Sequence, residues 1–123
     1  MPELPEVETI RRDLLPLVKG REIRSAWVSE NAPRLVQLVA RDEFVRLLPG
    51  HRIEDVSRRG KYLIFNLDKG MQWVVHLRMT GGFGFESTRH ERAVLELDDG
   101  TRVVYRDVRR FGTWLMVESE DLE

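Results

Sequence analysis

The chain has 123 residues, 41% of them hydrophobic, with 20 Lys and Arg residues against 21 Asp and Glu residues. This length fits one domain, and the absence of cysteine excludes disulfides, cysteine-ligated zinc and thiol catalysis in this chain. The apolar runs are too short to cross a bilayer, so a soluble, cytoplasmic protein without membrane contact is expected, and the net charge of −1 argues against a protein that coats nucleic acid by bulk charge.

The first predicted element is a helix that starts around Pro5 and stops at Gly20. Proline suits the first helical turn, and glycine commonly ends a helix. Apolar residues at helical spacing form one stripe, made of Val7, Ile10, Leu14 and Val18. Pro16 is expected to kink or shorten this helix. Pro2 and Glu3 should then lie just ahead of a helix N-terminus that packs onto the core.

After Gly20 the pattern changes to short apolar or alternating segments separated by turn residues. The predicted strands are residues 23–29, 52–57, 62–67, 72–77, 82–85, 93–97, 102–105 and 112–117. A second short helix is predicted over residues 41–48, with Asp42 as its cap. Closely spaced strands with few helices indicate a β-sandwich or a partly open barrel. We predict an α+β fold, mainly β: an antiparallel two-layer β-sandwich flanked by the two helices.

The charges are unevenly distributed along the chain. Arginine outnumbers lysine by 17 to 3, and the last six residues hold four acids. Without those six residues the chain has 20 basic and 17 acidic residues, a net charge of +3. Arginine pairs bidentately with phosphates and guanine edges, although a genome rich in G and C explains the bias equally well. The acidic end resembles a solvated linker that masks a mildly basic body.

The first residues carry groups that suit nucleophilic catalysis. Initiator methionine is ordinarily removed before a small residue, which would leave Pro2 as a free secondary amine. An α-amino group titrates near ~8, and a nearby helix N-terminus lowers that value. Such an amine can attack an electrophilic carbon and form an iminium ion, while Glu3 moves protons. The alternative is that Pro and Glu only start the helix, as they often do.

Four sequence blocks, taken together, resemble the formamidopyrimidine-DNA glycosylases, bifunctional base-excision repair enzymes related to endonuclease VIII. The blocks, in family order and spacing, are residues 1–8 (MPELPEVE), 58–63 (RRGKYL), 76–81 (HLRMTG) and 105–112 (YRDVRRFG). Leu4 is similar to the formamidopyrimidine branch, because the endonuclease VIII branch usually has glycine there.

The resemblance implies a mechanism for the first block. The amine of Pro2 attacks the sugar carbon that bears a damaged purine, expels the base and forms a Schiff base, after which β,δ-elimination cuts the DNA. Glu3 protonates the sugar ring oxygen or relays protons. Glu6 supports the site and the flipped base, although it is equally suited to a helix-start charge.

The middle blocks imply contacts with the DNA backbone. Lys61 follows a glycine and opens an apolar strand, and the resemblance assigns it to catalytic help and phosphate contact; the alternative is a solubilising lysine at the sheet rim. His76 and His90 match family positions near the DNA backbone, although a single histidine is more often structural.

Met79, Arg109 and Phe111 match the family residues that fill the hole left by a flipped nucleotide. An enzyme that extrudes a base must support the gap, and apolar wedges and an arginine suit that task. By composition alone, Met79 and Phe111 would be assigned to the core. Arg110 is expected to bind DNA, through a phosphate, or to pair with Asp107.

The resemblance makes residues 1–123 the N-terminal catalytic domain, with a helix-two-turn-helix and a zinc-finger region absent from this chain. One zinc ion is expected in that missing finger, and no metal or small-molecule cofactor in this chain. The expected partner is damaged double-stranded DNA, bound by a monomer in the bacterial cytoplasm at the nucleoid. Open alternatives are an endonuclease VIII-like enzyme for oxidised pyrimidines, a non-catalytic DNA-binding module, and a scaffold unrelated to DNA.

Overall fold

The computed structural model describes residues 4–30, 32, 35–37, 40–78, 81–86, 90–107 and 112–118. These residues form two helices and eight strands. The elements are α1 (Leu4–Val18), β1 (Ile23–Val28), α2 (Arg41–Leu47), β2 (Ile53–Arg59), β3 (Tyr62–Leu67), β4 (Met71–His76), β5 (Gly81–Gly84), β6 (Glu91–Leu97), β7 (Arg102–Asp107) and β8 (Thr113–Glu118). Every predicted strand and both predicted helices are present, with ends shifted by one or two residues.

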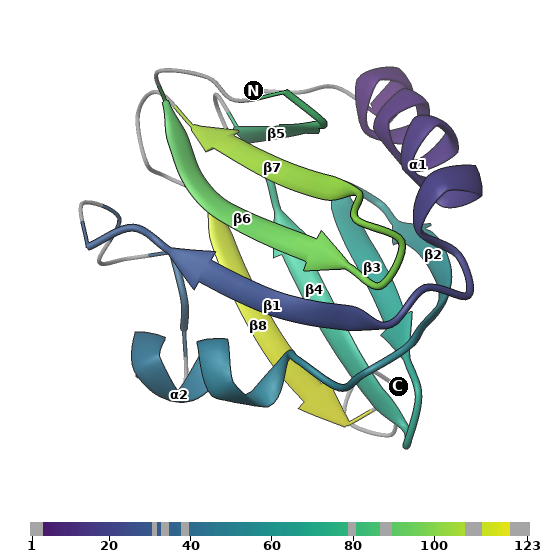
Figure 1. The fold of residues 1–123 in the computed structure, drawn as a ribbon. Coiled ribbons are helices and arrows are strands. Elements are labelled where there is room, and N and C mark those ends of the chain that lie inside the picture. Colours follow the sequence, from purple (N-terminus) through teal and green to yellow (C-terminus); the bar gives the residue numbers. More distant parts are fainter. Residues whose placement is uncertain are drawn as a thin grey trace.

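The strands form two four-stranded antiparallel sheets, ordered β1-β6-β7-β5 and β2-β3-β4-β8. The sheets lie face to face, with α1 and α2 on opposite flanks (Figure 1). The mainly β, two-layer sandwich with two flanking helices is therefore confirmed. The chain changes sheet three times, between β1 and β2, between β4 and β5, and between β7 and β8. The last two of these connections leave the same end of the sandwich, because β4 and β7 end there while β5 and β8 begin there.

The space between the sheets is filled by large aromatic side chains. Trp73 lies at the centre, stacked on Phe65 with ring centroids 4.0 Å apart and edge-on to Trp114 at 4.6 Å. Phe83 and Tyr105 extend this cluster toward the end where the chain changes sheet, with centroids 5.2 Å apart. Buried aromatic rings contribute much of the stability of such a core.

The first helix packs on β2 and also contacts β3 and β5. The predicted stripe faces inward, since Val7, Leu14 and Val18 are buried. The expectation that Pro16 shortens the helix is wrong, because α1 continues to Val18. Gly20 adopts a positive φ of 81°, as a glycine that ends a helix commonly does.

The second helix packs against β1 and buries Phe44 against Trp114, with ring centroids 5.9 Å apart. The predicted cap is wrong: Ala40 occupies the N-cap position without a side-chain hydrogen bond, and Asp42 lies within the first turn. An acid in the first turn still interacts favourably with the helix dipole. In the part of the chain described above, no helix is long and apolar enough to span a membrane.

Candidate functional site

The described positions among those singled out in the sequence lie at one end of the sandwich, toward the top of Figure 1. The β2–β3 turn, the end of β4 and the start of β8 lie there, as the pairings of Tyr62 with His76 and of His76 with Thr113 require. In the other sheet, Gly81 at the start of β5 pairs with Asp107 at the end of β7. Segments far apart in sequence are therefore adjacent in space at this end.

Lys61 lies in the tight turn between β2 and β3. Arg59 pairs with Tyr62, so Gly60 and Lys61 form a two-residue loop, and Gly60 adopts a positive φ of 60° that favours glycine. Lys61 thus immediately precedes β3, whose observed bounds are those predicted. Its side chain is partly exposed, at the tip of a rigid hairpin where a charged group can reach an anionic ligand.

His76 is the last residue of β4 and sits on the outer face of its sheet. Its ring meets Tyr62 edge-on, with centroids 4.8 Å apart, and only 9% of the residue is exposed. Burial, followed by the positive charges of Arg78 and Lys61, lowers the pKa of His76 below its usual 6.5. The imidazole is therefore neutral at neutral pH, and its Nδ1 is buried without a hydrogen-bond partner among the described residues.

A carboxylate on α1 joins the helix to the Lys61 turn. Glu8 accepts hydrogen bonds from Arg11 and Arg12 at 2.7 and 2.8 Å, and from Arg58 Nε at 3.2 Å. Arg58 also donates to the carbonyl oxygen of Gly60 at 3.0 Å. Arg11 is the main influence, with Arg12 and Arg58, that lowers the pKa of Glu8 to about 2 against the opposing effect of burial. The start of α1 and the turn that carries Lys61 are thus linked by one ionised group.

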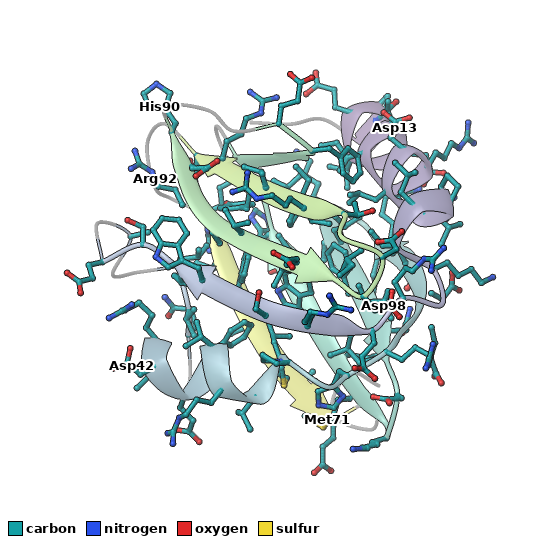
Figure 2. The ribbon with its side chains drawn as sticks, in the orientation of Figure 1. Asp13, Asp42, Met71, His90, Arg92 and Asp98 are labelled. Carbon is teal, nitrogen blue, oxygen red and sulfur yellow. The ribbon has the colours of Figure 1, made fainter. Side chains whose placement is uncertain are left out.

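The remaining described candidates are exposed at this end. Glu6 lies in the first turn of α1, with an exposed side chain. His90 precedes β6 and projects into solvent at the top of the molecule, near Arg92 (Figure 2). The backbone of His90 is fixed, because its carbonyl oxygen accepts the Asp107 N–H at 3.0 Å. Glu6 on α1, His90 ahead of β6 and Lys61 between β2 and β3 come from three separate parts of the chain.

The end of β7 contains a buried carboxylate that the sequence did not place in the site. Asp107 is 1% exposed, and its Oδ2 accepts hydrogen bonds from the Tyr105 hydroxyl at 3.0 Å and from the Gly112 N–H at 2.8 Å. The sequence suggested Asp107 or a phosphate as the partner of Arg110, a residue outside those that the structure describes. The signal available was the i, i+2 spacing of Tyr105 and Asp107, which puts both on the same face of a strand.

Several predicted site residues lie outside the described residues: Pro2, Glu3, Met79, Arg109, Arg110 and Phe111. Their described chain neighbours are Leu4, Arg78, Gly81, Asp107 and Gly112, at the end described above. Within the described ranges, no group of three His, Asp or Glu side chains is placed to hold a metal ion.

A comparison with family models matches residues 1–114 to the family described as formamidopyrimidine-DNA glycosylase N-terminal domain. Among curated proteins, the formamidopyrimidine-DNA glycosylase of Thermus thermophilus is 47% identical over 121 residues, and that of Bacillus subtilis is 45% identical over 119 residues. The match covers 98% and 92% of this chain respectively, but 42% of each relative. The chain therefore spans about two fifths of the length of these relatives.

Solved structures of the Lactococcus lactis protein superpose with a TM-score of 0.87 at 34% identity, covering 98% of this chain. The match covers 46% of the chain in a complex with DNA containing a formamidopyrimidine lesion (Fapy-dG), and 45% in a complex with DNA containing an abasic site. These complexes describe what the Lactococcus protein binds.

Proposed function

Because the chain belongs to the formamidopyrimidine-DNA glycosylase family through the family's N-terminal domain, we propose that it is the catalytic domain of a base-excision repair enzyme. The enzyme removes oxidised purines, such as 8-oxoguanine and formamidopyrimidines, and then cleaves the DNA at the resulting abasic site. It acts on double-stranded DNA as a monomer, without a small-molecule cofactor in this domain. Residues 1–123 supply the nucleophile and the DNA wedge, and a C-terminal region with a zinc finger would complete the DNA cleft.

The observation that best supports this proposal is the convergence at one end of the sandwich. The Lys61 turn, His76, and the β4–β5 and β7–β8 connections between the sheets all lie there. Four sequence blocks separated by tens of residues contribute to that one end. A binding surface built from several separate segments on a rigid sandwich is typical of an active site.

The proposed reaction begins at the Pro2 nitrogen once Met1 has been removed. The amine attacks C1′ of the damaged nucleotide; the N–C1′ bond forms as the bond from C1′ to the base breaks, and the base departs with the electron pair and takes up the proton that the amine nitrogen loses. The nitrogen lone pair then expels the ring oxygen from C1′ and forms the iminium ion. Ring opening leaves a negative charge on the sugar oxygen, which Glu3 protonates. The iminium ion then acidifies the neighbouring C–H bond, so elimination breaks the 3′ and then the 5′ phosphate ester bonds.

The described residues prepare the surface for this reaction. Lys61 offers a positive charge to a phosphate beside the lesion, at the tip of a hairpin that Arg58 and Glu8 hold against α1. His76 is kept neutral and offers an uncharged ring to the backbone, while Glu6 supports the flipped base from the first turn of α1. His90 and Arg110 contact phosphates farther along the strand.

One assay tests this function and separates it from its alternatives. The protein expressed from the complete gene is incubated with duplexes that carry 8-oxoguanine opposite cytosine or thymine glycol. We expect excision and strand cleavage at 8-oxoguanine and loss of both in Pro2→Ala. Preference for thymine glycol would favour the endonuclease VIII-like alternative. DNA binding with cleavage unaffected by Pro2→Ala would favour the non-catalytic module.

A further inference from the structure

Tyr105 and Asp107 form a buried polar pair between the two sheets. Both are 1% exposed and lie on the inner face of β7. The ring of Tyr105 is held by the core, with centroids 5.2 Å from Phe83 and 5.1 Å from Trp114. Its hydroxyl donates to Asp107 Oδ2 at 3.0 Å. The pair therefore extends the rigid aromatic core to the end of the sandwich.

Two of the connections between the sheets, β4–β5 and β7–β8, each meet this pair through a glycine. The Gly112 N–H donates to Asp107 Oδ2 at 2.8 Å, and a Cβ on Gly112 would overlap the Tyr105 hydroxyl oxygen. A Cβ on Gly81 would lie 2.6 Å from that same oxygen and 2.6 Å from the Leu77 carbonyl oxygen. The Tyr105 hydroxyl thus lies directly against the backbone of both connections.

The two glycines mark the points where the connections rejoin the fold. The Gly81 N–H donates to the Leu77 carbonyl at 3.0 Å, which closes the connection from β4 to β5. Arg78, inside this connection, has a positive φ of 53°, unusual for a residue with a side chain. The bond from Gly112 to Asp107 closes the connection from β7 to β8 in the same way. Met79 lies in the first closed segment, and Arg109 and Phe111 lie in the second.

We propose that Tyr105 and Asp107 are positioning residues that fix the bases of these two connections relative to each other. Through them, the proposed wedge residues Met79, Arg109 and Phe111 are presented to DNA as one unit. This role rests on the proposed function, because it concerns how the wedge residues are held while a nucleotide is extruded. The Tyr105 hydroxyl and the Asp107 carboxylate are too deeply buried to contact DNA themselves, so they act through the connections that they hold.

The chemistry of the pair suits a permanent anchor. Burial, together with the negative charge of Asp107, raises the pKa of Tyr105 above its usual value of 10. The hydroxyl consequently remains a donor over the physiological pH range. A carboxylate that accepts several hydrogen bonds inside a protein fixes its partners more strongly than a neutral acceptor does.

Tyr105→Phe and Asp107→Asn test the proposal, and Gly84→Ala is the matched control. Phenylalanine keeps the ring contacts and removes only the hydroxyl. Asparagine keeps the shape and removes the charge. Gly84 lies in β5 with nothing within 4 Å of an added Cβ.

The assay is single-turnover excision of 8-oxoguanine from two substrates, a fully paired duplex and a single-nucleotide bulge. In the bulge the lesion has no paired base, so less free energy is needed to extrude it. A 2-aminopurine beside the lesion reports unstacking by the wedge.

We expect both variants to lose at least about tenfold in rate on the paired duplex and about twofold or less on the bulge, since 1.4 kcal/mol of lost wedge support is tenfold. Their 2-aminopurine signal should fall, and Gly84→Ala should match the parent in every assay. Equal losses on both substrates, or no loss on either, would overturn the positioning role and leave the proposed function standing. A parent protein that excises from neither substrate would contradict the proposed function itself, and the positioning role with it.

Discussion

The middle of the sandwich and its proposed DNA-binding end, where Lys61 and His76 lie, are built on different principles. In the middle, Trp73, Phe65 and Trp114 pack rings against one another between the sheets. At the end, charged and polar groups hold turns in place: Glu8 with Arg58 on one side, and Asp107 with Gly112 on the other. The middle requires apolar volume, which many residues supply, whereas the end requires particular donors and acceptors at particular distances.

Because of this difference, substitutions in the middle and at the end should affect stability and function differently. Removal of a ring from the middle takes away many contacts at once, and stability and activity fall together. Removal of one polar atom from the end leaves the core intact and shifts the geometry of a turn. Tyr105 belongs to both regions, since its ring packs in the core and its hydroxyl reaches the end. The following changes test this division, from the largest expected loss of stability to the smallest.

Trp73→Ala should cause the largest loss, about 3–5 kcal/mol of unfolding free energy, because it empties the centre of the core. Trp73 is fully buried, whereas Trp27 is 49% exposed. The matched Trp27→Ala change should cost about 0.5 kcal/mol or less. Urea denaturation followed by circular dichroism measures both. Similar losses for the two tryptophans would contradict the placement of the core.

Gly112→Ala should cost about 1–3 kcal/mol, as overpacking does, because its methyl group would overlap the Tyr105 hydroxyl oxygen. The cost should shrink in a Tyr105→Phe background, where that oxygen is absent. Gly84→Ala, in open space on β5, should be neutral or stabilising by up to about 1 kcal/mol. A double-mutant cycle in urea measures the coupling. If Gly112→Ala loses the same unfolding free energy in the Tyr105→Phe background, the Tyr105 hydroxyl is not the group that excludes a side chain at position 112.

Glu8→Gln should cause a smaller loss of unfolding free energy, and the size of this loss should depend on pH. The pKa of Glu8 is lowered in the folded protein to about 2 from an ordinary value of 4.5. The folded state therefore binds this proton less readily than the unfolded state. The stabilisation is fully present above pH 4.5 and is lost as the pH falls toward 2. The stability difference between parent and Glu8→Gln should narrow across that window in melting experiments. A constant difference from pH 6 to 2 would refute the lowered pKa.

Lys61→Ala should change stability least, by about 0.5 kcal/mol or less, because the side chain is partly exposed at a turn. The same change should weaken DNA binding and reduce the slope of log K against log salt concentration by about 1, as the loss of one phosphate contact does. Lys69, in the turn at the opposite end of β3 and β4, provides the matched control. If Lys69→Ala reduces the slope of log K against log salt concentration by as much as Lys61→Ala does, the Lys61 turn is not the specific site of phosphate contact.

Much of the fold follows from local sequence patterns. The positive φ of Gly100 and of the Lys69-Gly70 pair is typical of the tight turns that join neighbouring strands, and the stripe around Leu14 faces the core as predicted. Pro16 did not shorten α1, because a proline in the last turn removes a single hydrogen bond and tertiary packing holds the helix. Asp42 did not cap α2, because the backbone places Ala40 at that position.

The contacts at the proposed DNA-binding end were harder to predict. The bond from Gly112 to Asp107 depends on how the chain folds back after β7, and no local pattern encodes that path. The sequence placed Gly112 in a predicted strand and did not single out Gly81 for its contacts, yet the proximity of both positions to Tyr105 requires glycine. The link from Glu8 to Arg58 spans 50 residues, so it too becomes visible only in the folded chain.

The central claim is that the Pro2 amine forms a covalent intermediate with damaged DNA. Sodium borohydride reduces such an iminium ion to a stable amine and so traps the protein on the strand. The protein from the complete gene, with Met1 removed, should form one adduct with an 8-oxoguanine duplex, and peptide mass spectrometry should locate it on Pro2. Protein that retains Met1 should form none, because its Pro2 nitrogen is an amide. An equally strong adduct with Met1 retained, or an adduct on Lys61, would contradict the account.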